Sequence, residues 1–355
     1  MAAPTYDPLL RDRAIAAYRH QVYAALGLAL YPHQAEWQLA TEGWTLLDAA
    51  PALGDHYVTV RVPDAADTTF YRESRAQHTL LVPRRIVPRP GGPAHHACNL
   101  AAYKAGKSWG GAAYLTGYAM TPDAHVQLIG AEYSISEPEF NYLVEFLCAD
   151  SPRGMGMPYR QLALDARNGR MRLHLQTGAL YECQSWENQK RLKGRKVDCY
   201  YYAEAFQLPG MICYNSISQN LREKRGRAIW TTTADEPWVV ALHDRAHGSD
   251  PDWHCTCGVS GEANTHTFSL DAIVRDAPSL DLLPPAVLAL AKQHHLKAGG
   301  MMTRERFAIS WLGQIGTFVG RVYEGYQRGG RQFSPLTHPQ LWRPDVTFDA
   351  VLEGR

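Results

Sequence analysis

The sequence lacks a strong net charge, long apolar runs and a regular arrangement of cysteines. Its 36 Lys and Arg and 35 Asp and Glu give a formal net charge of +1, so any nucleic acid has to be bound through local basic patches. No apolar run approaches the roughly 18 residues that span a bilayer. The seven cysteines are irregularly spaced, and no secretory signal precedes them. These absences predict a soluble intracellular protein without membrane contact.

A strand–loop–helix pattern between His95 and Thr116 carries the strongest chemical signal. A short apolar run leads into Gly106-Lys107-Ser108, and small residues at helical spacing follow. This order is typical of a P-loop, whose backbone N–H groups and helix dipole bind a phosphate chain. Lys107 is then expected to reach the β- and γ-phosphates, and the Ser108 hydroxyl to hold Mg²⁺.

The P-loop pattern is incomplete, because Ala101 occupies the position of its first glycine. The alternative is an ordinary helix start with an exposed lysine. The residues predicted to bind nucleotide through this loop are Ala101, Ala102, Tyr103, Lys104, Ala105, Gly106, Lys107 and Ser108.

The N-terminal part is predicted to be helical over residues 8–30 and again over 36–47, with a break at Tyr31-Pro32. Gln34 follows this break, and a glutamine amide can pair with the Hoogsteen edge of adenine. The alternative is an ordinary helix start. Residues 56–87 are β-branched and alternating, which predicts an inserted strand pair followed by a Pro/Gly linker.

A second candidate site feature follows the predicted strand Val197–Tyr202, which ends in Ala203-Glu204. A carboxylate at the end of a strand neighbouring the P-loop strand can orient an attacking water. The alternative is a solvated glutamate that opens a helix. Thr232 and Thr233 end another predicted strand, where hydroxyl groups can sense the γ-phosphate; the alternative is an ordinary Thr-rich strand end.

Alternating strands and helices predict an α/β, three-layer P-loop NTPase fold of the ASCE (RecA-like) type with a mainly parallel central sheet. Ser136 and Glu139 are expected to cap the helix after the strand His125–Gly130, and a hairpin is expected around Thr177-Gly178. The predicted divisions are an N-terminal helical piece (1–50), an inserted β segment and linker (51–93), an ATPase core (94–275), a C-terminal helical piece (276–325) and a linker and tail (326–355). The two helical pieces are expected to form one lid subdomain.

Taken together, these segments resemble the ATPase half of the large terminase subunit of tailed bacteriophages, the motor that packages DNA. The resemblance covers roughly residues 25 to 325. Tyr31 and Gln34 look like the family's adenine-binding motif, Ala101–Ser108 like its deviant P-loop, and Thr232-Thr233 like its coupling motif. Ala203-Glu204 stands where the family has an acidic pair, so the first acid is missing.

The resemblance implies binding of ATP and Mg²⁺ and hydrolysis of ATP, with Glu204 and Lys107 as catalytic residues. Lys104 is the only basic residue placed to act as the arginine that the family's loop often holds. Asp198 lies further back on the strand than a metal ligand is expected to. A nuclease domain, with which family members usually continue, is not expected in this chain.

The implied partners are double-stranded DNA, the portal protein, the small terminase subunit, and a nuclease domain or separate nuclease polypeptide. Subunits are expected to assemble as a homo-oligomeric ring in the host cytoplasm, at the portal vertex of the procapsid. A neighbouring subunit is expected to supply an arginine, for which Arg222, Arg225 and Arg227 are candidates. The basic residues that we expect to contact DNA are Lys190, Arg191, Lys193, Arg195, Arg222 and Arg225.

Two other functions remain open from the sequence. Because Ala203 replaces an acid, the chain can instead be a nucleotide-binding assembly module that does not hydrolyse ATP. It can also be a different P-loop motor that translocates nucleic acid. Turnover of ATP by the purified chain separates the first alternative from both motors.

Overall fold

The computed structural model describes residues 8–28, 30, 32–46, 86–103, 105–192, 194–257 and 270–313. The chain divides into two units, Met1–Ile315 and Gly316–Arg355, and every described residue belongs to the first. Among the helices of the described part, none has the length and apolar character needed to cross a membrane.

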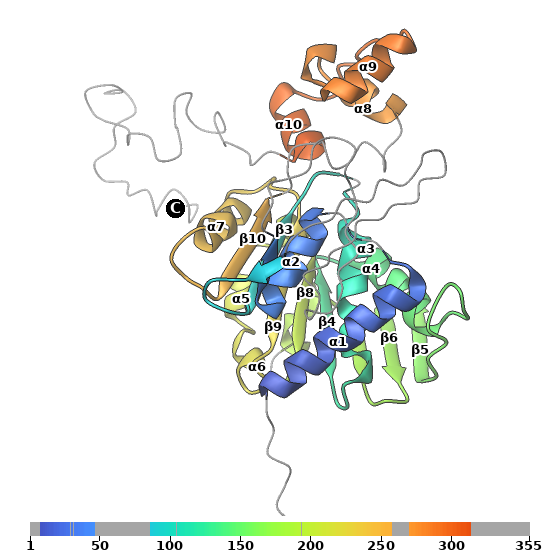
Figure 1. The fold of residues 1–355 in the computed structure, drawn as a ribbon, viewed down its shortest axis with the longest axis vertical. Helices are drawn as coiled ribbons and strands as arrows, with labels where there is room; N and C mark the ends of the chain where they lie inside the picture. Colours follow the sequence, from blue (N-terminus) through green and yellow to red (C-terminus); the bar gives the residue numbers. More distant parts are fainter. Residues whose placement is uncertain are drawn as a thin grey trace, which may run out of the picture. The chain divides into compact units, whose positions relative to one another are not determined.

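The central element is an eight-stranded sheet (Figure 1). Its strands are β3 (His96–Leu100), β4 (His125–Gly130), β5 (Tyr159–Asp165), β6 (Arg170–Leu175), β7 (Leu180–Ser185), β8 (Cys199–Ala203), β9 (Arg227–Thr232) and β10 (Trp253–Cys257). They lie in the order β10-β3-β9-β8-β4-β7-β6-β5, and the six strands from β10 to β7 are parallel. The predicted α/β fold with a mainly parallel central sheet is confirmed.

The antiparallel edge of the sheet is formed by β5, β6 and β7. The pairing of Arg172 with Glu182 across β6 and β7 confirms the predicted hairpin around Thr177-Gly178. One expectation about strand order is wrong. Strand β9 lies between β3 and β8, so the strand that ends at Ala203 is not the neighbour of the P-loop strand. Strand order depends on long-range pairing that local patterns do not report.

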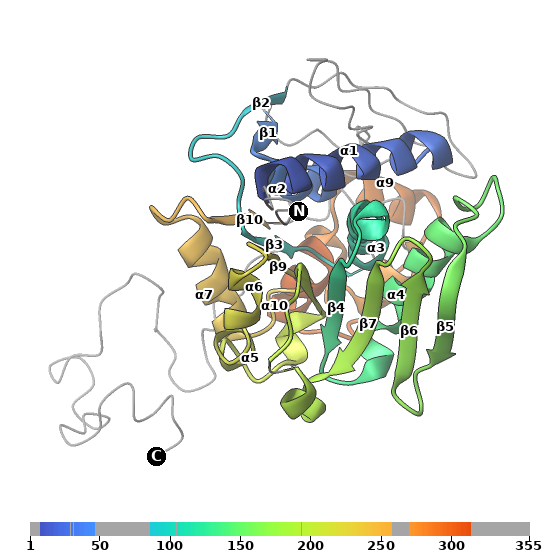
Figure 2. The same ribbon diagram turned by 90° about the horizontal axis from the view of Figure 1, so that it is seen from below.

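Helices cover both faces of the sheet (Figure 2). One face carries α1 (Pro8–Leu26), α2 (Pro32–Glu42), α3 (Lys107–Leu115), the short helix η1 (Thr116–Met120) and α4 (Tyr133–Cys148). The other face carries α5 (Ile212–Asn215), α6 (Gln219–Arg222) and α7 (Pro237–Ala246). Strand β8 shows why both faces are apolar: Tyr201 and Ala203 join the first core, whereas Tyr200 and Tyr202 join the second.

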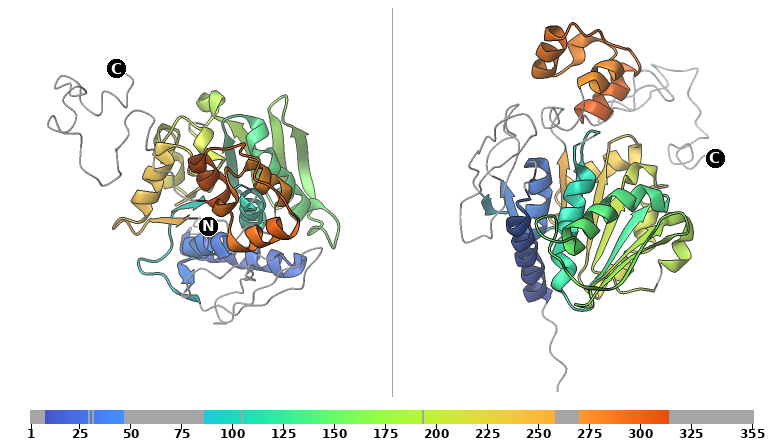
Figure 3. Two further views of the ribbon diagram at one scale, coloured as in Figure 1. Left: turned by 90° about the horizontal axis from the view of Figure 1, so that it is seen from above. Right: turned by 90° about the vertical axis from the view of Figure 1, so that its right-hand side faces the viewer.

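The N-terminal helices pack beside α3 in the helical layer that covers one face of the sheet, as the two views of Figure 3 show for the blue helices beside the teal α3. A separate core is formed by α8 (Leu270–Asp276), η5 (Leu280–Leu282), α9 (Pro285–Gln293) and α10 (Arg304–Leu312). This arrangement differs from the expected single lid of N- and C-terminal helices. Trp37 on α2 and Tyr23 on α1 are fully buried in the core that these helices share with the sheet. The helices α1 and α2 therefore do not form a lid with the C-terminal helices.

Two boundaries near the N-terminus differ from the prediction. Helix α2 begins at Pro32, a residue that favours a first helical position, and ends at Glu42 rather than Leu47. The strand β1 (Trp44–Leu46) follows and pairs antiparallel with β2 (Ile86–Pro88). Most of the predicted inserted β segment lies outside the described residues.

Candidate functional site

The loop between β3 and α3 joins a buried strand to a helix start. Ala101 donates its backbone N–H to the Thr232 carbonyl at 3.0 Å, which ties the loop to the end of β9. Gly106 has a φ of 71°, a left-handed conformation that favours glycine, and no side chain caps α3. The first N–H groups of α3 have no partner within the helix and form its positive end. This geometry favours an anion at the loop.

Lys107 and Glu204 come together although they lie on different elements. Lys107 is 6% exposed, and its Nζ donates to the carbonyls of Ala101 and Ala102 at 3.2 and 3.0 Å. The same Nζ lies 3.7 Å from Glu204 Oε1. The alternative of an exposed lysine at an ordinary helix start is therefore wrong.

Glu204 has a strained backbone. It follows the end of β8 and has a φ of 41°, in the left-handed region that a residue with a Cβ rarely adopts. Such a conformation costs on the order of 1–3 kcal/mol and occurs preferentially at functional sites. Its Oε2 is buried and accepts no hydrogen bond from any described residue. The carboxylate thus has one oxygen beside Lys107 and one oxygen available to a ligand.

Thr232 and Thr233 connect the end of β9 to the residues around Glu204. Thr232 Oγ1 accepts a hydrogen bond from the Phe206 N–H at 2.9 Å and donates to the Thr233 carbonyl at 3.0 Å. Thr233 Oγ1 donates to Asp235 Oδ2 at 2.9 Å. Both threonines are buried, and Thr232 holds the segment after Glu204 in place, whereas Thr233 fixes Asp235.

Arg306, which no sequence pattern singles out, extends this connection to the C-terminal helices. Its guanidinium lies 3.1 Å from Asp235 Oδ1 and donates to the Tyr103 hydroxyl at 2.8 Å. The Tyr103 N–H in turn donates to the Ser310 carbonyl at 2.6 Å. Helix α10 therefore contacts both the loop before α3 and the segment after β9.

Gln34 lies against the loop. It is fully buried on α2, and its Nε2 donates to the carbonyls of Gly106 and Ala105 at 2.6 and 3.4 Å. Its neighbour His33 contacts Asn99 on β3, and burial lowers the pKa of His33 to about 4. Gln34 therefore supports the loop backbone in this structure, and its contact with adenine stays a prediction.

Tyr31 and Lys104 lie outside the described residues, so their predicted roles stay predictions as well.

Glu139 is the site residue that the sequence analysis misassigned. It lies inside α4, which begins at Tyr133, and therefore caps no helix start; Ser136 is also buried within the helix. Glu139 is 1% exposed, and burial raises the pKa of its carboxyl to about 7, while the nearby Ser108 side chain lowers it. Its Oε2 has no hydrogen-bond partner among the described residues. Two carboxylates thus lie at the start of α3.

The basic residues predicted to contact DNA lie at the other end of the parallel strands. Arg195 precedes β8, and Arg222 and Arg225 precede β9, whereas the loop and Glu204 follow strand ends. Arg222 and Arg225 are exposed, and Arg195 is partly exposed while it donates to Glu182 at 2.6 Å. Lys193 and the side chains of Lys190 and Arg191 lie outside the described part.

Two charged residues at the amino end of the parallel strands form ion pairs within the chain. Arg227 is buried and binds both carboxylate oxygens of Asp12 at 3.1 and 3.0 Å, so it is no exposed arginine for a neighbouring subunit. Asp198 accepts hydrogen bonds from the His125 N–H and from Lys224 Nζ at 2.7 and 2.8 Å and pairs with Arg11. It is thereby excluded as a metal ligand beside the loop.

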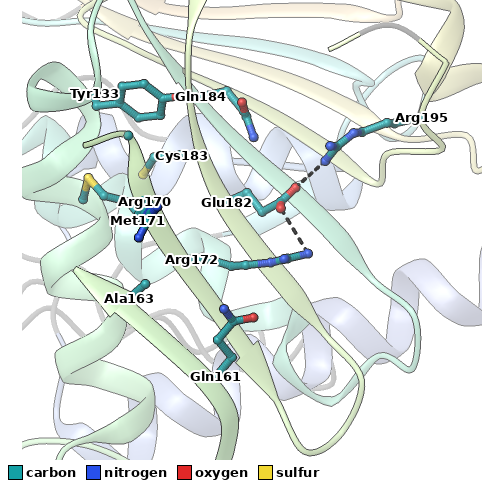
Figure 4. Close-up of a pocket in the computed structure, with 11 residues that line it drawn as sticks. Tyr133, Gln161, Ala163, Arg170, Met171, Arg172, Glu182, Cys183, Gln184 and Arg195 are labelled. Atoms are coloured by element: carbon teal, nitrogen blue, oxygen red, sulfur yellow. Dashed lines mark hydrogen bonds and ion pairs between the residues drawn. The ribbon is translucent and has the colours of Figure 1, made fainter. Parts of the chain in front are cut away.

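A cavity of about 270 Å³ lies on the antiparallel part of the sheet (Figure 4). Arg172 and Arg195 both point to Glu182 within it, at 3.2 and 2.6 Å. His125 contacts the same carboxylate at 2.8 Å. Strands β9, β8 and β4 separate this region from β3, so the cavity is distinct from the loop site.

No family model and no curated protein sequence matches the chain. Its fold is similar to three solved structures. The large terminase ATPase domain of Thermus phage P74-26 is 16% identical with a TM-score of 0.40, over 48% of this chain and 78% of that domain. The HK97 bacteriophage large terminase is 14% identical with a TM-score of 0.42, over 57% of this chain and 43% of that protein.

The third structure is the large terminase of a thermophilic bacteriophage. It is 11% identical with a TM-score of 0.44, over 66% of this chain and 52% of that protein, which was also solved with ADP. The chain thus spans about half of the length of these two longer terminases. All three structures are large terminases or their ATPase domains.

Proposed function

We propose that this chain is a P-loop ATP hydrolase that drives double-stranded DNA into a viral procapsid. The observation that carries the proposal is the approach of Lys107 Nζ to Glu204 Oε1, 3.7 Å, beside an uncapped helix start. The N–H groups of α3 and Lys107 stabilise the negative charge that develops on the γ-phosphoryl group. Glu204 accepts a hydrogen bond from the attacking water and orients it.

The residues at the start of α3 fit a Mg²⁺ ion. The Ser108 hydroxyl and the buried, unpartnered Oε2 atom of Glu204 are hard oxygen donors of the kind that Mg²⁺ prefers. When bound, the ion neutralises charge on the β- and γ-phosphates. The chain's part is to hold the Ser108 hydroxyl and the Glu204 carboxylate in place.

The contacts of Thr232 and Thr233 support a coupling role. Loss of the γ-phosphate frees Lys107 and Glu204, and Thr232 holds the backbone that follows Glu204. Thr233, Asp235 and Arg306 then connect this change to α10. This chain of contacts is the part of the protein that converts hydrolysis into movement of the C-terminal helices.

DNA, the portal protein, the small terminase subunit and a nuclease are the partners in this proposal, and the working form is a ring at the portal vertex in the host cytoplasm. Arg222 and Arg225 are the exposed basic side chains for DNA phosphates. Their double replacement by Ala should weaken DNA binding at all sequences and lower the slope of log K against log salt by about 2. Filter binding at about 50–200 mM salt measures this slope. An unchanged slope would show that Arg222 and Arg225 do not contact DNA phosphates.

The test of the proposed activity is hydrolysis of ATP by the purified chain with Mg²⁺, with and without double-stranded DNA. The proposal predicts turnover that rises when DNA is present. Binding of ATP without turnover, even in a reconstituted packaging complex, would instead favour a non-hydrolysing assembly module. The buried methyl group of Ala203 in place of an acid is the observation that favours this second candidate.

A further inference from the structure

The end of β8 offers one carboxylate where the predicted chemistry needs two. Ala203 is fully buried and shares the core on the α4 side of the sheet. Its methyl group can neither bind a cation nor accept a hydrogen bond from a bound water. Glu204 alone would then have to orient the attacking water and help to hold the cation.

Glu139 brings a second carboxylate to the same place from a different element. Helix α4 packs along α3, which brings the Glu139 carboxyl near Ser108 in the first turn of α3. The electrostatic influence of both Lys107 and Glu204 reaches this carboxyl group. Lys107 on α3, Glu204 after β8 and Glu139 on α4 therefore bring one cation and two carboxylates near the start of α3.

The burial of Glu139 is costly unless a ligand or cation offsets it. The side chain is 1% exposed, and its Oε2 has no hydrogen-bond partner among the described residues. An unpartnered buried carboxyl oxygen costs about 1–3 kcal/mol, and more when it is ionised. A methionine at this position would avoid that cost, and the oxygen is therefore a candidate ligand for a cation.

We propose that Glu139 is a metal-binding residue that replaces, from α4, the carboxylate missing at Ala203. Together with Ser108 it holds the divalent cation that accompanies ATP, which leaves Glu204 to orient the water. This inference rests on the proposed function for the identity of the nucleotide, but its central claim is about cation affinity.

The test is binding of Mn²⁺ in the presence of a non-hydrolysable ATP analogue, followed by electron paramagnetic resonance. Glu139→Gln keeps the shape of the side chain but loses the charge. It should raise the Kd of Mn²⁺ about 10- to 100-fold, the usual cost of losing a partner at a metal site. Binding of the analogue in EDTA should stay unchanged.

The matched control is Glu145→Gln, an exposed carboxylate on the same helix, which should bind Mn²⁺ like the parent chain. A parental Mn²⁺ affinity in Glu139→Gln would overturn the inference. If that variant does not fold, as judged by circular dichroism, Glu139→Met is measured with the same two outcomes. Ala203→Asp added to the Glu139 variant should recover Mn²⁺ affinity, because it returns a carboxylate to β8.

The two proposals fail in different ways. If the parent chain binds Mn²⁺ and the analogue with dependence on Glu139 but never hydrolyses ATP, the proposed function fails and the metal-binding inference holds. If the parent chain hydrolyses ATP and Glu139→Gln changes neither the rate nor the Mn²⁺ affinity, the inference fails and the function holds.

Discussion

Several buried charged groups at the two ends of the parallel strands differ in their ion-pair partners and in backbone strain. At the amino end, Asp198 faces Arg11 and Lys224, and Arg227 binds Asp12. At the carboxyl end, Glu139 and Glu204 each keep a buried oxygen without a described partner, and Glu204 adopts a left-handed backbone. Breaking a buried ion pair leaves an uncompensated charge and destabilises the fold, whereas backbone strain occurs preferentially at functional sites.

The comparison predicts that changes at the carboxyl end affect activity far more than stability. Lys107→Ala removes the cation that reaches Glu204 and the phosphates, and we expect ATP hydrolysis to fall by at least about 10²–10³-fold. The unfolding midpoint in urea should change little. The control Lys297→Ala removes an exposed lysine and should hydrolyse ATP like the parent chain.

Changes at the amino end should do the reverse. Arg227→Met breaks the buried pair with Asp12 and the hydrogen bond to the Thr41 carbonyl, and should lower the free energy of unfolding by about 3–5 kcal/mol. Below the unfolding transition, each folded molecule should hydrolyse ATP at the parental rate. Arg153→Met, at an exposed position, is the control for urea unfolding. Equal stabilities of these two variants would contradict the contrast between the two ends.

The sequence predicts the part of this contrast that depends on neighbouring residues, but not the part that depends on contacts between residues far apart in the chain. The loop, Glu204 and the two threonines follow strand ends, so local patterns identify them. Glu139 does not, because Ser136-x-x-Glu139 before an apolar run has the form of a capping box, and only the packing of α4 on α3 brings it to Ser108.

The same limit explains the position of Gln34 and the place of β9. The pattern around Gln34 indicates a polar side chain near a helix start but not the loop carbonyl it meets, because α2 and α3 are more than 60 residues apart in the sequence. The insertion of β9 between β3 and β8 follows from pairing between distant strands.

A smaller effect is expected where the site meets the C-terminal helices. Arg306→Ala removes the contacts with Asp235 and the Tyr103 hydroxyl. A coupling of about 0.5–2 kcal/mol corresponds to hydrolysis that is about 2- to 30-fold slower. Because this ion pair is partly exposed, stability should fall by less than about 1 kcal/mol. Arg304→Ala, in the same helix turn but paired with Asp281, should keep the parental rate; an equal loss in both variants would argue against the connection.

The smallest effect concerns pH and the amino-terminal layer. Burial alone would raise the pKa of Glu42, but His20 and Arg19 hold it below its usual value. The unfolded chain therefore binds a proton at Glu42 before the folded chain does, so the stabilisation is complete above the usual pKa and is lost as pH falls through the folded value.

The melting temperature of the parent chain should therefore fall more steeply below the ordinary glutamate pKa of about 4.3 than that of Glu42→Gln. Glu223→Gln, an exposed glutamate, should follow the parent chain. Identical profiles for the parent chain and Glu42→Gln would show that the pair with Arg19 and His20 does not stabilise the fold.

The most direct measurement of the proposed hydrolytic site is a single-turnover experiment with ATP and Mg²⁺ on the parent chain and Glu204→Gln. We expect that both bind ATP with similar affinity, that the parent chain converts it to ADP, and that the variant retains it unhydrolysed. Parental turnover in Glu204→Gln would contradict the assignment of Glu204 and, with it, the proposed hydrolytic site.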